Sequence, residues 1–266
     1  MKRIFLSADM EGTCGIANWD ETNKNKPDYT YFANQMTREV AAACQGALDG
    51  GADETLVKDA HDSARNIDPS GLPEQAKIFR GWAGNLSSMM MGLETGFAGV
   101  IFTGYHSAAG INGNPLSHTM NTQNVFVKIN GELASELMIN SLTAAMLNVP
   151  VLMVTGDKAL CEWITKVNPN ILTVPVNEGT GRGALSIHPD LAVRRIRETA
   201  EKAMALDGSL CMFPMPPHFA VEICYKEHSA ALSNSFYPGC VQMDSRTVRF
   251  ETDEYMEVLR FFHFCL

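Results

Sequence analysis

Short apolar segments alternate with longer amphipathic segments along the first two thirds of the chain. Residues 2–8, 54–59 and 96–104 have the composition of buried strands, and the sequence PVLMVT at 150–155 is the clearest strand of all. Residues 31–48 repeat apolar side chains near a helical period and are followed by two glycines, which commonly end a helix. Strands that alternate with helices predict an α/β fold with a mostly parallel sheet flanked by helices.

The remaining segments extend this pattern to the end of the chain. We expect further strands at 125–130, 220–225 and 247–251, and further helices at 132–147, 189–206 and 253–262. Beyond about residue 168 the strands alternate polar and apolar residues, which is typical of strands with one exposed face. We therefore expect an α/β core at 1–168 and a smaller lobe with the carboxyl-terminal segment at 169–266, with one continuous domain as the alternative.

The composition indicates which kinds of partner and which cellular location to expect. The 266 residues are 45% hydrophobic and carry a net charge of -9, which supports a core but offers no basic surface to a nucleic acid. No segment approaches the roughly 20 apolar residues that cross a bilayer, and the first residues lack the pattern of a signal peptide. The seven cysteines include no C-x-x-C pair, which predicts free and mostly buried thiols. We expect a cytoplasmic protein with no nucleic-acid or membrane partner.

Three of the predicted strands end in side chains that bind metals. Asp9 and Glu11 follow the first strand, His61 follows the second, and His106 follows the third. Ligands of open α/β sheets bind outside the carboxyl ends of the strands, so these side chains should meet there. Each residue alone is more often an ordinary cap or loop residue, but their joint position at strand ends favours a metal site. Mixed histidine and carboxylate ligands fit Zn²⁺ or Mn²⁺.

The spacing of the first two carboxylates suits a pair of ions. Asp9 and Glu11 are two residues apart, so on an extended chain they point to the same side, roughly 6.6 Å apart at the backbone. Two carboxylates so placed can bind neighbouring ions about 3.5–4 Å apart. Gly12 would then let the backbone turn away without a side-chain clash.

Three weaker signals leave alternatives open. Asp59 and Asp62 flank His61, and either could orient its imidazole ring or be an ordinary loop acid. The glycine-rich run around Arg182 lacks the spacing of known phosphate-binding loops, so it is a flexible turn or a loop whose arginine reaches a substrate carboxylate. The polar segment 18–31 could shape the mouth of a pocket.

Five short motifs occur in a fixed order along the chain. They are Ser7–Gly12, Asp59–Ser63, Gly104–His106, Ser117–Met120 and Ser135–Leu137. Their order and approximate spacing resemble those of the DppA-type D-aminopeptidases, the M55 metallopeptidases, most strongly from residue 1 to about 160. The resemblance implies an α/β unit with a smaller lobe, an active site with two zinc ions per subunit, and a homodecamer of two pentameric rings. Manganese and cobalt ions are the alternatives to zinc.

The resemblance also implies the role of each site residue. The implied metal ligands are Asp9, Glu11, His61, His106 and Glu136. Asp9 would bridge the two ions, and His118 matches a catalytic histidine that lies near the metals without binding them. Glu132 is the alternative to Glu136, but it follows an Asn-Gly turn as an exposed acid would, whereas Glu136 lies beside apolar residues of a predicted helix.

The resemblance therefore implies a zinc-dependent aminopeptidase that releases N-terminal amino acids, and specifically D-amino acids, from short peptides or aminoacyl amides. Two zinc ions carry +4 and the three carboxylates −3, and the residual positive charge favours hydroxide over water between the ions. His118 would move a proton, stabilise the oxyanion or attack as a nucleophile. Two other classes stay open: a non-catalytic metal- or peptide-binding relative, and a dinuclear-metal phosphoesterase, which would need basic residues near the ligands.

Overall fold

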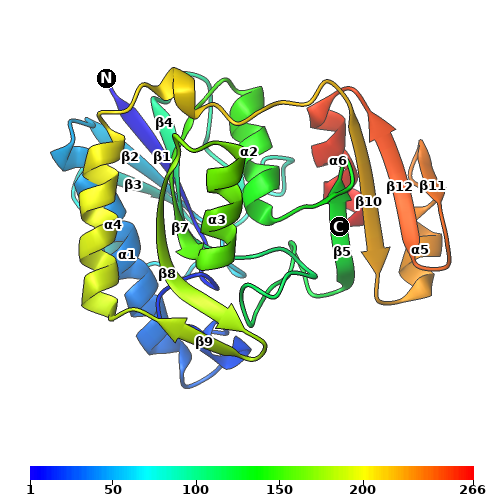
Figure 1. The fold of residues 1–266 in the computed structure, drawn as a ribbon, viewed down its shortest axis with the longest axis horizontal. Coiled ribbons are helices and arrows are strands. Elements are labelled where there is room, and N and C mark those ends of the chain that lie inside the picture. Colours follow the sequence, from blue (N-terminus) through cyan, green and yellow to red (C-terminus); the bar gives the residue numbers. More distant parts are fainter.

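A seven-stranded sheet forms the centre of the larger part of the molecule in this computed structural model, which describes residues 1–266 (Figure 1). In spatial order it contains β3 (Ala76–Phe79), β2 (Glu54–Asp59), β1 (Arg3–Ala8), β4 (Gly99–Tyr105), β7 (Val151–Asp157), β8 (Leu172–Thr180) and β9 (Gly183–Ser186). All neighbouring strands are parallel except β8 and β9, which form a hairpin. The expected α/β fold with a mostly parallel sheet is confirmed.

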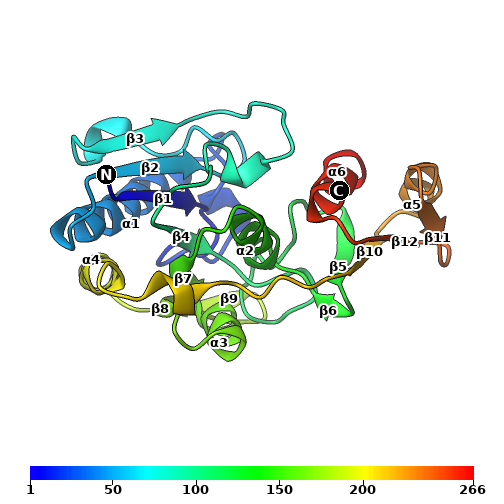
Figure 2. The ribbon, with the colours of Figure 1, turned by 90° about the horizontal axis from the view of Figure 1, so that it is seen from above.

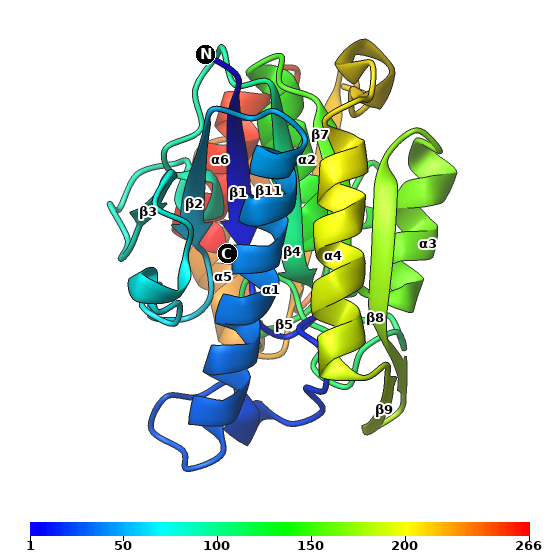
Figure 3. The ribbon, with the colours of Figure 1, turned by 90° about the vertical axis from the view of Figure 1, so that its left-hand side faces the viewer.

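Helices cover both faces of this sheet, which explains why its central strands are buried along almost their whole length. Helices α1 (Tyr29–Asp49) and α4 (Pro189–Ala203) pack side by side on one face, the face seen in Figure 3. Helices α2 (Glu136–Met146) and α3 (Lys158–Val167) lie on the other face (Figure 2). Every residue of β4 and β7 is buried, as expected for strands enclosed on both sides.

A second, antiparallel sheet forms a smaller lobe beside α2 (Figure 1). In spatial order it contains β11 (Cys240–Gln242), β12 (Thr247–Thr252), β10 (Phe219–Tyr225), β5 (Asn124–Ile129) and β6 (Glu132–Leu133). Helices α5 (His228–Asn234) and α6 (Tyr255–Cys265) pack against it, and α6 also contacts α2. The Tyr255 hydroxyl donates to the Ile139 carbonyl at 2.5 Å and so ties the two helices together.

The sheets divide the chain differently from the expected boundary near residue 168. Strands β8 and β9 and helix α4 follow that residue but belong with the parallel sheet, whereas β5 and β6 precede it and pair in the smaller sheet. The chain therefore enters the smaller lobe, returns to the parallel sheet and leaves it again. The division into domains at residue 168 stays a prediction, with the single continuous domain as its alternative.

One predicted helix begins later than its pattern indicated. The segment 132–147 starts with the two residues of β6, which pair with β5, and α2 begins only at Glu136. Ser135 ends the extended segment because its hydroxyl accepts from the Met138 amide and caps the helix.

Two expectations from composition can be compared with the structure directly. All seven cysteines are free, and all but Cys240 are buried, which confirms the interpretation from their spacing. None of the helices has the length and apolar character required to traverse a lipid bilayer.

Candidate metal centre

The predicted site residues converge at the carboxyl ends of three neighbouring strands. Asp9 and Glu11 lie in the loop after β1, His61 follows β2 and His106 follows β4, and β1 lies between the other two strands. Glu136 reaches the same place from the first turn of α2. These five residues are at most 6% exposed although each is polar or charged. A buried group of three carboxylates and two imidazoles requires compensation by protons or cations.

The loop that carries the two acids crosses the end of β4 at very short range. The Gly12 amide donates to the Gly104 carbonyl at 2.8 Å, and a Cβ atom on Gly12 would lie 1.9 Å from the Tyr105 carbonyl oxygen. Only glycine allows this approach. Gly12 was expected to avoid a side-chain clash, and the clash it avoids is with the main chain of β4. The Asn114 amide then donates to the Glu11 carbonyl at 3.0 Å and fixes the loop from the other side.

The metal-binding atoms form two groups, each with its atoms within 4.8 Å of one another. One group comprises Asp9, Glu11 and His61, and the other comprises His106, His118 and Glu136. Asp9 joins the two, because its Oδ1 lies 3.5 Å from His61 Nδ1 and its Oδ2 lies 3.4 Å from His106 Nε2. A carboxylate with one oxygen toward each group has the position that a bridging ligand needs.

Main-chain carbonyls fix the ring orientation of all three histidines. His61 Nε2 donates to Thr22 at 2.9 Å, His106 Nδ1 to Ser107 at 3.0 Å, and His118 Nδ1 to Leu116 at 2.9 Å. A carbonyl only accepts, so that ring nitrogen carries the proton and the other nitrogen of a neutral ring presents a lone pair. In each case this second nitrogen faces a carboxylate oxygen. Lone pairs that face each other repel unless a proton or a cation lies between them.

Two atoms at the middle of the site have no hydrogen-bond partner. They are Asp9 Oδ2 and His106 Nε2, and both are completely enclosed. Buried polar atoms in folded proteins are nearly always satisfied, so two facing acceptors without a partner indicate a missing ligand. Carboxylate oxygen and neutral imidazole nitrogen are the donor atoms that zinc accepts in enzymes, so these residues fit that ion.

The pKa values reflect the crowding of negative charge. Burial raises the pKa of Asp9 to about 6, with repulsion from Glu11 and Glu136 adding to it. Burial alone would lower the pKa of His61, but the charges of Glu11 and Asp9 and the hydrogen bonds to both together outweigh burial and raise that pKa well above its ordinary value. Burial alone would raise the pKa of Glu136, but the charge and hydrogen bond of His106 and the charge of His118 together outweigh burial and lower that pKa to about 2. The carboxylate charge that attracts protons to the imidazoles would equally attract dications, which displace those protons on binding.

His118 lies at the edge of the second group. Its ring stacks on His106 with centroids 4.4 Å apart, and the edge of Trp19 packs on it at 5.2 Å. Its Nε2 lies 3.6 Å from Glu136 Oε1, within reach of a metal-binding position as well as of the cavity. The expectation of a catalytic histidine that does not bind metal therefore stays a prediction. Trp19 was not predicted, and its only signal was the polar segment 18–31.

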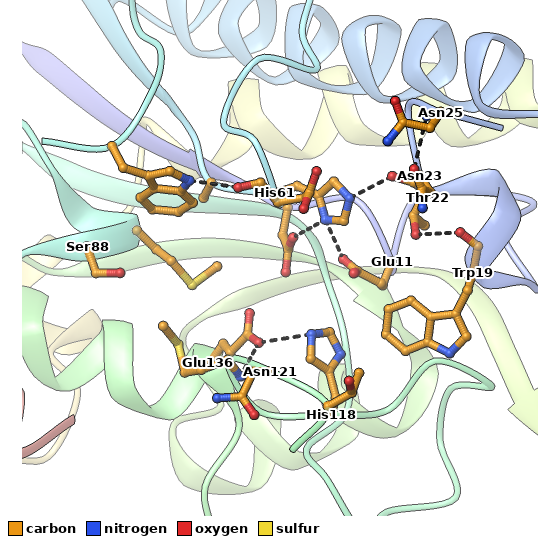
Figure 4. Close-up of a pocket in the computed structure, with 17 residues that line it drawn as sticks. Glu11, Trp19, Thr22, Asn23, Asn25, His61, Ser88, His118, Asn121 and Glu136 are labelled. Carbon is orange, nitrogen blue, oxygen red and sulfur yellow. Dashed lines mark hydrogen bonds and ion pairs between the residues drawn. The ribbon is translucent and has the colours of Figure 1, made fainter. Parts of the chain in front are cut away.

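A cavity of about 630 Å³ opens over these groups (Figure 4). The segment 18–31 contributes part of its wall, namely Trp19, Thr22, Asn23 and Asn25. Trp82, Met89 and Met120 line other parts. No lysine or arginine lines the cavity, and Arg182, in the β8–β9 hairpin, lies elsewhere.

The flanking acids do not orient the His61 ring. Asp59 accepts from the main-chain amide of Asn66 at 2.6 Å and from its side chain at 2.9 Å, so it stabilises the loop after the histidine. No hydrogen bond or ion pair joins Asp59 or Asp62 to the imidazole, which the Thr22 carbonyl orients instead. A main-chain group leaves no trace in the residue pattern, which is why this partner was missed.

The two candidate glutamates near α2 have different surroundings. Glu136 Oε1 accepts from the Met120 amide at 2.6 Å, inside the site. Glu132 is exposed and accepts from Trp163 Nε1 at 2.6 Å, away from the cavity.

Comparison with known proteins gives a consistent result. The family model of the peptidase M55 D-aminopeptidases matches residues 1–264. A D-aminopeptidase of Bacillus subtilis (strain 168) is 28% identical over 257 residues, which cover 96% of this chain and 93% of that protein. The solved structure of the Zn-dependent D-aminopeptidase DppA from Bacillus subtilis, described as a self-compartmentalizing protease, aligns with a TM-score of 0.90 and 26% identity over 98% of this chain and 95% of that one. The chain therefore belongs to the peptidase M55 family of D-aminopeptidases.

Proposed function

We propose that this protein is a zinc-dependent aminopeptidase that removes N-terminal D-amino acids from short peptides or aminoacyl amides. The observation that carries the proposal is the set of imidazole lone pairs directed at buried carboxylates, with Asp9 Oδ2 and His106 Nε2 unpaired between the two groups. The relatives named D-aminopeptidase support the reaction class, and the zinc dependence of the solved relative supports the metal.

Hydrogen bonds within the protein orient two of the proposed metal ligands. The ligands are Asp9, Glu11, His61, His106 and Glu136, with Asp9 shared between two ions. Zinc would polarise the scissile carbonyl and make water acidic enough to act near neutral pH. The carbonyls of Thr22 and Ser107 keep the proton on the distant ring nitrogens, so the facing nitrogens of His61 and His106 are available as ligands in the neutral rings.

His118 is proposed to move a proton at its Nε2 atom. The Leu116 carbonyl holds the proton on Nδ1, so Nε2 of the neutral ring is an acceptor. This nitrogen can take a proton from the attacking group and return it to the leaving amine. The rings of His106 and Trp19 keep the imidazole in one orientation.

The lining of the cavity favours a peptide over a phosphoester. Carboxylates and amides surround the metal groups, and no lysine or arginine is present to bind a phosphate. A substrate with a free α-amine is positively charged and suits this lining. The phosphoesterase alternative lacks the basic side chains that it would need.

The decisive experiment combines metal analysis with a substrate screen. The zinc-loaded protein is assayed with D- and L-aminoacyl amides, dipeptides and phosphoesters. We expect two zinc ions per subunit and hydrolysis of the D-aminoacyl compounds. Hydrolysis of phosphoesters alone would overturn the peptidase proposal, and bound metal without any turnover would favour a non-catalytic binding relative.

The variant His118→Ala distinguishes a catalytic role of this histidine from a role as a metal ligand. We expect His118→Ala to retain both ions and to lose turnover by about 100-fold or more, since proton transfer by a positioned side chain contributes that much. Loss of one ion in this variant would instead make His118 a ligand, as its distance to Glu136 permits.

We also propose that the chain assembles into a homo-oligomer, a decamer of two pentameric rings, and that it works in the cytoplasm. The self-compartmentalizing relative supports the assembly. Sedimentation velocity at several protein concentrations tests it, and a purely monomeric species at all concentrations would contradict it.

A further inference from the structure

A second, smaller cavity adjoins the metal cavity. Its volume is about 160 Å³, and it shares Trp82, Ser88 and Met120 with the larger cavity. Ser88 lies on the opposite side of the metal groups from Trp19 (Figure 4). We call this second cavity the apolar chamber, defined by the loop 82–88 and by Met120, Ile139, Asn140, Leu259, Phe262, His263 and Leu266.

The lining of the apolar chamber offers few free polar groups. Ile139, Leu259 and Phe262 are apolar and at most 8% exposed. The side-chain amide of Asn140 already donates to the Tyr105 hydroxyl at 3.0 Å. An apolar cavity of about 150 Å³ is large enough to take a benzene ring. The chamber therefore has the size and lining for one benzyl or isobutyl group.

The chamber lies directly beside a proposed metal ligand. Met120 forms part of its wall, and the Met120 amide donates to Glu136 Oε1 at 2.6 Å. Ile139 and Asn140 lie about one turn beyond Glu136 on α2. A substrate side chain bound in the chamber would therefore belong to a part of the substrate close to the reacting carbonyl.

The walls of the chamber are held by contacts from several elements. Met120 and Ser88 adopt left-handed backbone conformations, with φ of 64° and 44°, which persist only where the surroundings enforce them. Trp82 Nε1 donates to the Asp62 carbonyl at 2.7 Å. The Asn121 amide, in the wall of the metal cavity, donates to the main-chain oxygen of Leu266 at 2.8 Å. A preformed wall of this kind selects among side chains by size.

We propose that the apolar chamber receives an apolar side chain of the peptide being hydrolysed, up to the size of a benzyl group, and so makes this enzyme prefer substrates with bulky apolar residues. The proposal rests on the proposed peptidase function, because it assigns a substrate class to the same site. The side chain belongs to the N-terminal residue or to the residue that follows it, and two substrate series distinguish these sources.

The first series varies the N-terminal residue. The amides of D-alanine, D-leucine and D-phenylalanine are compared by kcat/KM with the zinc-loaded protein and with Leu266→Trp, which fills the chamber from the segment after α6. We expect the wild-type protein to prefer D-phenylalanine amide over D-alanine amide by about tenfold or more. We expect Leu266→Trp to lower this ratio about tenfold.

The second series keeps D-alanine first and varies the second residue of a dipeptide in the same way. If Leu266→Trp lowers the preference for the bulky residue only in this series, the chamber receives the side chain of the second residue. Phe264→Trp is the matched control, because Phe264 lies two residues before Leu266, is 66% exposed and is absent from the lining. We expect its ratios to equal those of the wild-type protein in both series.

Equal ratios in the wild-type protein and Leu266→Trp, in both series, would overturn the chamber proposal while leaving the peptidase function intact. Absence of any hydrolysis by the wild-type protein would instead overturn the peptidase function. In that case calorimetric titration with D-phenylalanine amide and D-alanine amide still tests the chamber, because only the first should bind about tenfold more weakly to Leu266→Trp. Leu259→Phe fills the chamber from α6 and replaces Leu266→Trp if the latter fails to fold or to bind zinc.

Discussion

At the scale of single residues, Asp9 is the side chain that lies next to histidines of both metal-binding groups. Its two oxygens lie 3.5 Å from His61 Nδ1 and 3.4 Å from His106 Nε2. We therefore expect Asp9→Ala to lose both ions together, measured as metal content per subunit after dialysis. Asp62→Ala is the matched control, because Asp62 lines the same cavity but makes no hydrogen bond or ion pair with an imidazole. Retention of one ion in Asp9→Ala would exclude the bridging role.

A second prediction for a single residue concerns Glu39, a carboxylate buried in α1. It accepts from the Cys14 amide at 3.0 Å and from Gln35 Nε2 at 2.8 Å, but its Oε2 has no partner. Burial raises its pKa from 4.5 to about 7. The unfolded chain therefore loses its proton first as the pH rises, and stability falls between about pH 4.5 and 7 by up to about 3 kcal/mol.

Glu39→Gln keeps the accepting oxygen and removes the titration. We expect its free energy of unfolding, relative to the wild-type protein, to improve by up to about 3 kcal/mol between pH 4.5 and pH 8. Urea unfolding at both pH values measures this difference. Glu198→Gln, at an exposed position of α4, is the control and should show no such change. A difference between Glu39→Gln and wild type that is independent of pH would contradict the prediction.

The residues of the site could be predicted because their chemistry is unusual at strand ends. Asp9, Glu11, His61 and His106 are ordinary residues when taken singly, but together they follow three predicted strands, and the structure brings them close to one another. The partners that orient the rings could not be predicted, because the carbonyl of Thr22 and others like it belong to the main chain. The sequence also gives no sign that a tryptophan from the loop before α1 would pack on a histidine more than ninety residues away.

At the scale of elements, the close contact of α1 with α4 depends on glycine. A Cβ atom on Gly46 would lie 2.2 Å from the Arg197 carbonyl oxygen, which belongs to the main chain of α4 and cannot move alone. Alanine favours a helix by about 1 kcal/mol over glycine, but overpacking costs about 1–3 kcal/mol or more. We expect Gly46→Ala to lower the free energy of unfolding by about 1–2 kcal/mol in urea.

Gln45→Ala provides the matched control for this helix contact. Gln45 is the preceding residue, and its side-chain amide donates only to Asp49 at 2.9 Å. We expect this variant to change stability by less than about 0.5 kcal/mol. A Gly46→Ala variant as stable as Gln45→Ala would mean that the two helices can separate at little cost.

Helices and strands with a strong hydrophobic periodicity could be predicted from the sequence. Short elements that form only by pairing with another segment could not. The strand expected at 54–59 agrees with β2, and the helix expected at 31–48 agrees with α1 within two residues. Strand β6 has two residues and exists only because β5 lies beside it. Its pairing is a tertiary contact, so the local pattern of 132–147 predicted helix throughout.

At the scale of the whole molecule, the arrangement of the two sheets depends on pairing between distant segments. Strand β5 pairs with β10 almost a hundred residues later, and β8 returns to the parallel sheet beside β7. Local periodicity carries no information about such partners, so the exchange of segments between the lobes could not be predicted. The arrangement matters for function because α6 of the smaller lobe forms one wall of the apolar chamber.

The metal centre should also stabilise the whole fold, because its ligands come from four separate segments of the chain. Asp9 and Glu11, His61, His106 and Glu136 meet only in the folded state, and three carboxylates repel one another there in the absence of cations. A ligand that binds only the folded state at about 1,000 times its Kd stabilises by about 4 kcal/mol. For a chain of this size about 1 kcal/mol shifts Tm by roughly 2–4 °C.

We therefore expect chelation of zinc to lower the Tm of the wild-type protein by on the order of 10 °C at fixed protein concentration. Scanning calorimetry with and without a chelator measures the shift. Asp9→Ala should show almost no shift, since it is expected to hold neither ion, whereas Asp62→Ala should behave as the wild type. A wild-type Tm that is the same with and without zinc would show that the carboxylates are fully compensated by protons in the folded state, and it would remove the link between the metal centre and stability.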